Sequence, residues 1–239
     1  MTFSSRIIIL HTLKFRDNSV IINGYSDSAG RQNYILYFSG KSKKYAALSS
    51  LHPLSIIDAQ IGSTKGDLKT ITEFHPAYKL QSIRCNIIKC SLAMFMSELL
   101  FKTVKELEKN PELFSFIEAS IIELEKIETS YKDYHLRFVA RLCGYMGYLP
   151  EDNFSSSNRI FSLTKGRFSN GLNPGESYFN EVNSAALHSL LCEDFNTSNI
   201  LTSGKERSYF LEELIRYLSY HSGFEINIQS LSILHEVFE

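Results

Sequence analysis

The stretch SVIINGYSDSAGRQNYILYF, residues 19–38, has the pattern of two β-strands joined by a tight turn. β-branched and aromatic residues fill its two ends, and the polar segment Asp27–Gly30 separates them, with a glycine where a positive φ is favoured. Such a pattern is typical of an antiparallel hairpin. The stretch therefore predicts that the N-terminal part of the chain is built from strands.

Three further runs rich in β-branched and aromatic residues flank this hairpin in the sequence. Together they make five predicted strands, at 6–14, 19–26, 31–38, 54–62 and 66–75. Gly62–Gly66 predicts a second hairpin, while the longer polar connection that begins at Ser39 suits a crossing between the two halves of a Greek-key barrel. This arrangement favours a five-stranded OB-fold barrel over residues 1–80.

Beyond Gln81 the spacing of apolar residues changes from two to about 3.6, which predicts a mostly α-helical domain over residues 81–239. Asn110 and Pro111 are a capping residue and a first helical residue, and Gly147 is a helix terminator. The fold class predicted is thus α+β. The predicted helices lie at about 87–100, 111–129, 131–145, 178–191, 205–221 and 231–238, with an irregular excursion at about 151–175 that holds at most a small hairpin.

Composition narrows the class of protein. The chain has 239 residues, of which 44% are hydrophobic and 21% charged, close to the averages of globular domains. The apolar run Ile7–Leu10 is too short for a membrane span or the core of a signal peptide, so we expect neither. Four scattered cysteines do not form a disulfide framework, which favours reduced thiols and a cytoplasmic protein.

The motifs of common metal and catalytic sites are missing from the sequence. Cys85 and Cys90 are five residues apart, Cys143 and Cys192 are isolated, and no two histidines are spaced four apart, so no zinc site is predicted. Gly40-Lys41-Ser42 resembles the end of a P-loop, but Ile35 stands where that loop needs glycine. No nucleophile elbow, zincin helix or dinucleotide turn occurs either. We therefore predict a protein that is not an enzyme, with no metal and no cofactor.

Positive charge is concentrated in the predicted barrel. Residues 1–80 hold ten Lys and Arg against five Asp and Glu, although the formal net charge of the whole chain is -1. Such an asymmetry indicates an anionic partner, and an OB-fold binds single strands through basic loops and aromatic faces on which bases stack. Tyr25, Tyr34, Tyr37, Phe38 and Tyr45 are the nearby aromatic residues, although each could instead fill the core. The predicted DNA-binding residues are Lys14, Arg16, Arg31, Lys41, Lys43, Lys44, Lys65 and Lys69.

A second candidate site lies on the predicted helix at 131–145. Arg137 and Arg141 are four residues apart on one helical face, with Phe138 and Leu142 adjoining. Either this is the solvated edge of a buried helix, or the arginines bind an acidic peptide while the apolar neighbours take its hydrophobic anchor.

Several short segments, in a fixed order over nearly all of the chain, match a known family, although none is a signature alone. They are Ile9–Phe15, Gly30-Arg31, Gly40 with the basic run after it, Tyr78–Ser82, Arg137-Phe138, Gly144–Tyr148 with Pro150, and Leu231–Phe238. On these segments the chain as a whole resembles the RecO family of bacterial DNA repair and recombination mediators.

The resemblance implies an N-terminal OB-fold, a helical C-terminal domain and a nucleoid-associated mediator of repair. It implies binding to single- and double-stranded DNA, annealing of strands coated with single-stranded DNA-binding protein (SSB), and help in loading RecA together with RecR and sometimes RecF. Gly40–Lys44 and Arg31 match the DNA-contacting face, and Arg137 matches a basic helix that binds the SSB C-terminal tail; Arg141 extends that site.

Two departures from the family pattern limit the resemblance. Many members carry a zinc-binding cysteine cluster after the helix that ends near Pro150, but Glu151–Ser157 has no cysteine, so zinc is not carried over. Family members also often have a basic residue just before the glycine that starts the basic loop, where this chain has Ser39. Two alternatives stay open: an interaction adaptor whose barrel does not bind nucleic acid, and an enzyme that acts on nucleic acid.

Overall fold

The computed structural model describes residues 2–38, 48–62, 68–129, 131–171, 173–192 and 200–238. The chain divides into two compact units, Met1–Ile127 and Glu128–Glu239, each of which has its own packed interior. No helix of the described ranges is both long enough and apolar enough to cross a membrane.

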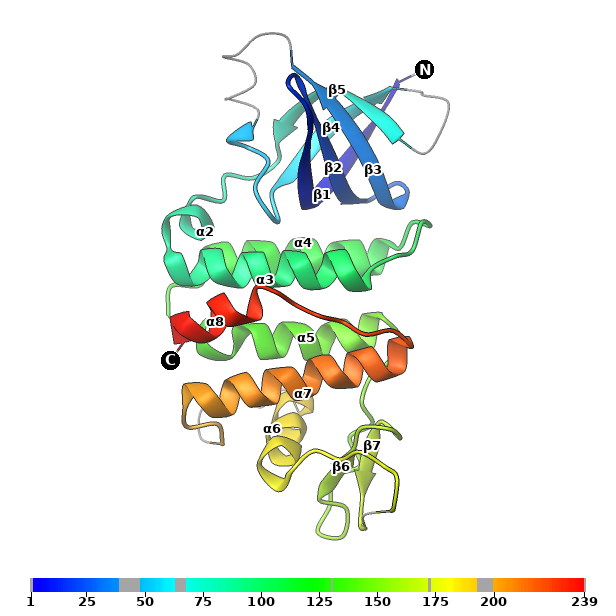
Figure 1. Cartoon of the computed structure of the whole chain (residues 1–239), viewed down its shortest axis with the longest axis vertical. Coiled ribbons are helices and arrows are strands. Elements are labelled where there is room, and N and C mark those ends of the chain that lie inside the picture. The colour runs from blue at the N-terminus through cyan, green and yellow to red at the C-terminus, as the bar shows by residue number, and fades with distance from the viewer. Residues whose placement is uncertain are drawn as a thin grey trace. The chain divides into compact units, whose positions relative to one another are not determined.

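The first unit begins with a closed barrel in the order β1-β2-β3-β5-β4 (Figure 1). β3 and β5 are parallel, and the other neighbours are antiparallel. This confirms the α+β class and the OB-like barrel predicted from the strand pattern. The strands are β1 (Thr2–Arg16), β2 (Ser19–Ser26), β3 (Gly30–Tyr37), β4 (Ile56–Gly62) and β5 (Leu68–Pro76).

β1 closes the barrel because it pairs with two partners. Its N-terminal half pairs with β4 and its C-terminal half with β2, with a register shift between Ile9 and His11 where the strand passes from one neighbour to the other. Ile7 and Ile9 point into the barrel core, whereas the hydroxyl of Ser97 on α3 (Ile87–Thr103) donates to the Leu10 carbonyl at 2.7 Å. The run Ile7–Leu10 is therefore buried on both faces of the sheet.

Among its described residues, the first unit also contains the helices α2 (Gln81–Cys85), α3 and α4 (Pro111–Lys126). Asn86 and Asn110 cap α3 and α4, since each side chain accepts hydrogen bonds from backbone N–H groups of the first helical turn. The buried Lys89 ammonium joins α2 and α4, because it donates to the Ser82 hydroxyl at 2.7 Å and to the Glu125 carbonyl at 2.8 Å. These contacts extend the first unit well past residue 80.

The second unit is mainly helical. α5 (Tyr134–Tyr145) is followed by Gly147 (φ 82°), where Tyr148 N donates to the Cys143 carbonyl and Gly147 N to the Gly144 carbonyl, the bonding pattern of a Schellman cap. Ser203 and Glu206 form a capping box at the start of α7 (Gly204–Ser222). The elements are η1 (Tyr131–Asp133), α5 (Tyr134–Tyr145), β6 (Ile160–Ser162), β7 (Arg167–Ser169), α6 (Glu181–Leu191), α7 (Gly204–Ser222) and α8 (Leu231–Phe238).

The excursion at 151–175 contains the small hairpin that the sequence suggested, formed by β6 and β7. Aromatic packing stabilises it: the Phe161 ring lies 5.1 Å from both Phe168 and Phe179, and all three are buried. The Asn153 side chain accepts from Phe168 N at 2.7 Å and donates to Phe168 O at 3.0 Å. The family's zinc cysteine cluster does not fit Glu151–Ser157, which lacks cysteine, and apolar packing holds the hairpin.

Candidate nucleic-acid interface

The strand register gathers polar and aromatic residues at one end of the barrel. Arg16 on β1 pairs with Ser19 on β2, and Ser19 pairs with Tyr37 on β3, so these residues form a row across three strands. Lys14 lies two positions before Arg16 on the same strand. In Figure 1 this end of the barrel is the one farther from α3 and α4.

Ser19 is buried, but the other side chains named at this end are exposed and combine positive charge with aromatic rings. Phe15 is 48% exposed and Tyr37 61%, and the Arg16 guanidinium lies 5.2 Å from the centre of the Phe15 ring. Lys14 and Arg16 are also exposed. We call Lys14, Phe15, Arg16 and Tyr37 the hairpin patch. In proteins that bind single strands, cations bind the phosphates and open aromatic faces stack on the bases.

Lys69 belongs to a neighbouring part of the same barrel. Lys69 is the second residue of β5. It pairs with Tyr34, which lies three residues before Tyr37 on β3. Its ammonium lies 5.9 Å from the centre of the Phe3 ring, and Phe3 is 44% exposed. This is a second pairing of a cation with an exposed aromatic ring, outside the hairpin patch.

Arg31 lies at the opposite end of β3 and has a different role. Its guanidinium donates to the carbonyls of Phe101 and Val104 at 3.1 and 3.4 Å and lies 4.4 Å above the Phe101 ring. Burial lowers the pKa of Arg31 to about 10. Because these carbonyls end α3, Arg31 is a C-terminal cap of that helix. Arg31 is therefore separated from Lys14 and Arg16, which lie at the other end of the barrel.

Four of the predicted DNA-binding residues, Lys41, Lys43, Lys44 and Lys65, lie outside the described residues, and so does Tyr45. Their contribution to a DNA-binding surface stays a prediction.

The aromatic residues divide between core and surface. Tyr25, Tyr34 and Phe38 are at most 8% exposed, so they fill the interior of the first unit, and only Tyr37 of the described candidates is open to a base. Phe15 was not among the predicted aromatic residues, although its position between Lys14 and Arg16, beside the turn that follows β1, was a usable signal.

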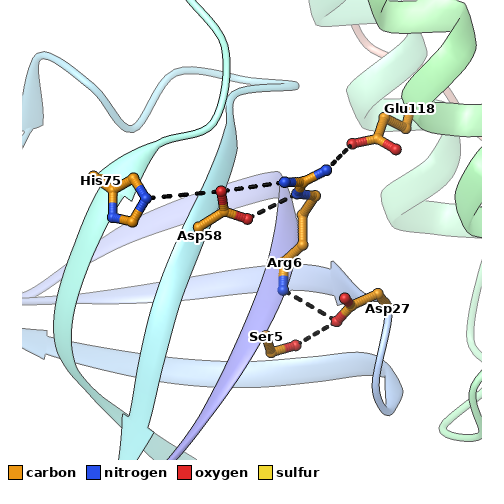
Figure 2. A network of polar contacts seen from close by, with 6 residues as sticks. All are labelled: Ser5, Arg6, Asp27, Asp58, His75 and Glu118. Atoms are coloured by element: carbon orange, nitrogen blue, oxygen red, sulfur yellow. Dashed lines mark hydrogen bonds and ion pairs between the residues drawn. The ribbon is translucent and has the colours of Figure 1, made fainter.

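Not every positive charge of the barrel is available to bind a phosphate, as Arg6 shows. Figure 2 shows its guanidinium between Asp58 and Glu118, with distances of 2.7 Å from Nε to Asp58 Oδ1 and 3.1 Å from Nη1 to Glu118. The hydrogen bonds to Asp58 raise the pKa of Arg6 and lower the pKa of Asp58. The Ser5 hydroxyl and Arg6 N both donate to Asp27 beside this pair. Arg6 therefore joins the barrel to α4 as one member of a compensated network.

The predicted peptide site on α5 requires a correction. Phe138 and Leu142 are 3% and 0% exposed, so both are core residues of the second unit and neither can anchor a partner peptide as predicted. Arg141 is exposed, and Arg137 is half-buried with its guanidinium 5.8 Å from the Tyr134 ring centre. Tyr145, 42% exposed, continues the spacing of four residues after Arg141.

One cluster of metal-ligand side chains occurs in the described part of the second unit. Asp152, His188 and Cys192 place their ligand atoms within 4.8 Å of one another. In the sequence, spacings between like residues do not reveal this cluster; the signal that could have found it is the mixed pair His188 and Cys192, spaced four residues apart on α6 and at its end.

Comparison with known proteins fits this architecture. The family model for the N-terminal part of recombination protein O matches residues 1–78, and the model for its C-terminal part matches residues 84–227. The chain belongs to the RecO family. The boundary between the two RecO family models thus falls between residues 78 and 84, whereas the compact first unit of the structure continues to Ile127.

Relatives with the RecO name match along the full chain. The protein named DNA repair protein RecO from Azobacteroides pseudotrichonymphae is 28% identical over 241 residues and covers 100% of both chains. Proteins of that name from Flavobacterium psychrophilum and Flavobacterium johnsoniae are each 29% identical, again with 100% of both chains covered. The chain is thus a RecO-family DNA repair protein.

Proposed function

We propose that this chain is a non-enzymatic mediator of repair that binds single- and double-stranded DNA through its barrel. The observation that supports the proposal most is the row of Arg16, Ser19 and Tyr37 with Lys14 and Phe15 beside it. In this proposal Lys14 and Arg16 contact phosphates, and Tyr37 and Phe15 stack on unpaired bases. Lys41, Lys43, Lys44, Lys65 and Lys69 extend the contact along the strand.

The proposed activity needs binding energy and no bond chemistry. Two complementary strands repel each other through their phosphates, and cations that neutralise both strands lower that repulsion. A surface that binds bare strands more tightly than coated strands also shifts the equilibrium toward removal of SSB. Annealing of SSB-coated strands and help in loading RecA, with RecR and sometimes RecF, are the functions we assign on this basis and on family membership.

For the SSB tail we propose a revised site on α5. An acidic peptide would bind the row made by Arg137, Arg141 and Tyr145, in which two guanidinium groups meet carboxylates and the tyrosine ring meets an apolar side chain. This keeps the arginines that the sequence suggested and replaces Phe138 and Leu142, which are core residues.

The test of DNA binding is fluorescence anisotropy of a labelled oligonucleotide of about 30 nucleotides over a salt series. Four to six phosphate contacts give a slope of log K against log salt of roughly -3 to -4, and changing both Lys14 and Arg16 to Ala flattens it by about 1.4. Changing Lys41, Lys43 and Lys44 to Ala flattens it further. Tyr37→Ala weakens binding roughly 5- to 150-fold with the slope unchanged, because it removes stacking alone.

A double change of Lys79 and Lys109 to Ala is the matched control, since both lysines are exposed and lie on the first unit outside the hairpin patch. It removes the same charge and leaves the slope unchanged. Absence of salt-dependent binding by the native chain at low salt would overturn the proposal and favour the adaptor alternative. Cleavage of labelled strands incubated with Mg²⁺ would instead favour an enzyme.

A further inference from the structure

Asp152, His188 and Cys192 come together because of two local features. His188 and Cys192 are four residues apart, at the end of α6 and its C-terminal cap, so their side chains lie on one face. Asp152 follows the end of α5 by a short connection and reaches the same point. His188 Nδ1 lies 2.8 Å from Asp152 Oδ1, and Cys192 Sγ lies 3.2 Å from Asp152 Oδ2 and 3.5 Å from His188 Nδ1.

These distances are close to the edges of a zinc coordination tetrahedron. Zinc bonds of about 2.3 Å to sulfur and about 2.0–2.2 Å to nitrogen and oxygen give edges of about 3.4–3.6 Å between ligand atoms. The Sγ–Nδ1 and Sγ–Oδ2 edges already lie within about 0.4 Å of those lengths. The two short contacts of Asp152 use different carboxylate oxygens, so the oxygen that binds the ion has to shift relative to His188 or Cys192. With one ligand atom from each residue, the three atoms all lie within 4.8 Å of one another.

The chemistry of the three groups also suits zinc. A thiolate, an imidazole and a carboxylate form a mixed set of sulfur, nitrogen and oxygen donors, and Zn²⁺ accepts all three. Two anionic ligands balance the charge of the ion. Binding would replace the hydrogen bond between His188 and Asp152 and release the proton of the Cys192 thiol.

Neighbouring aromatic rings orient the histidine. The Phe154 ring stacks on the His188 ring with centroids 4.2 Å apart and an interplanar angle of 17°. The Phe168 ring meets the same imidazole edge-on, with centroids 6.3 Å apart. A ring held between two neighbours loses little rotational freedom when its nitrogen binds a metal, so the entropic cost of binding is small.

We propose that Asp152, His188 and Cys192 form a Zn²⁺ site with water as the fourth ligand. The set differs from a cysteine cluster in the excursion, because two of its ligands come from α6 and its cap. The bound ion would tie the segment after α5 to the end of α6 and brace the β6–β7 hairpin between them.

The test is metal binding to the full chain, in a reductant that lacks thiols, with Zn²⁺ displaced from a chromophoric chelator and with Co²⁺ as a spectroscopic probe. The expected result is one tightly bound ion per chain and, with Co²⁺, a thiolate charge-transfer band together with the visible bands of a tetrahedral ion. Cys192→Ser, His188→Ala and Asp152→Asn each weaken Zn²⁺ binding at least about tenfold, and Cys192→Ser removes the charge-transfer band.

Cys85→Ser is the matched control, because Cys85 is also an exposed thiol but lies in the first unit. It leaves binding and spectrum unchanged. Binding that survives Cys192→Ser, binding lost equally in Cys85→Ser, or no binding by the native chain would each overturn the proposal. Asp152→Asn differs from the native chain by one atom on the surface, so its circular dichroism should match the native spectrum and separate loss of binding from loss of folding.

Discussion

Three arginines of the barrel, Arg6, Arg16 and Arg31, differ in function because they meet different surroundings. Arg6 is paired with two carboxylates, Arg31 is buried against carbonyl groups, and Arg16 is exposed beside Phe15. Their chemistry is the same, so a sequence predicts their charge but not which of them a phosphate can reach. That distinction depends on partners such as Glu118 and Val104, which are far away in the chain.

At the same scale, His135 should make stability depend on pH. It is buried in α5, and burial, followed by the nearby Arg207 and His235, lowers its pKa to about 3. Between that value and the ordinary pKa of about 6.5 the unfolded chain binds the extra proton, so stability present above pH about 6.5 is lost as the pH falls. Between pH 7.5 and pH 5 this group accounts for a loss of about 2 kcal/mol.

Urea unfolding of the native chain and of His135→Gln at both pH values measures this loss. Between pH 7.5 and pH 5 the free energy of unfolding of the variant should fall by about 2 kcal/mol less than that of the native chain, whatever the stability of the variant at pH 7.5. His135→Met serves if the glutamine variant is too unstable to measure. Equal decreases in native and variant chains would show that His135 can take up a proton within the fold.

At the scale of elements, strands and helices were predicted well because their signals are local. The predicted strand at 19–26 is β2, the predicted helix at 231–238 is α8, and Pro111 begins α4 as expected. Tertiary contacts were not predictable in this way. The same apolar pattern gives Phe38 in the core and Tyr37 on the surface, because adjacent residues of a strand face opposite sides.

The contact between β3 and α3 gives a prediction at this scale. Arg31→Met removes the donor that caps the last carbonyls of α3 and leaves them without that hydrogen bond. The expected loss of stability is about 1–3 kcal/mol, measured by urea unfolding. The salt slope of DNA binding should stay unchanged, since Arg31 lies away from the hairpin patch.

Arg16→Met is the matched control for Arg31→Met and should give the reverse pattern. Arg16 is exposed, so its loss should change stability by less than about 0.5 kcal/mol while flattening the salt slope. A native-like stability of Arg31→Met would contradict the capping role.

At the scale of the whole molecule, the contacts and the sequence pattern divide the chain differently. The period of the apolar residues changes near residue 80, where one type of secondary structure gives way to another, whereas the contacts unite everything up to Ile127. α3 covers the outer face of β1, where Ile8 is fully buried and Leu10 is 3% exposed. A change of period marks a change of element type, which need not coincide with the edge of a packed core.

Fragments test where the first unit ends. Residues 1–127 should unfold cooperatively on heating, whereas residues 1–80 should not. Exposure of Ile8 and Leu10 costs about 3–6 kcal/mol, a large part of the stability of a small domain. The measurement is circular dichroism at increasing temperature. A sharp transition in the shorter fragment would place the boundary at residue 80 instead.

The strand order of the barrel also sets an order of assembly during synthesis. β5 lies between β3 and β4, so a nascent chain that has emerged only as far as Gly62 carries every strand except the one that completes the ring. Until β5 follows, the edges of β3 and β4 offer unpaired backbone groups to any other extended chain. We expect the ribosome-bound intermediate to be the aggregation-prone form of this protein, and the arrival of residues 68–76 to end that exposure.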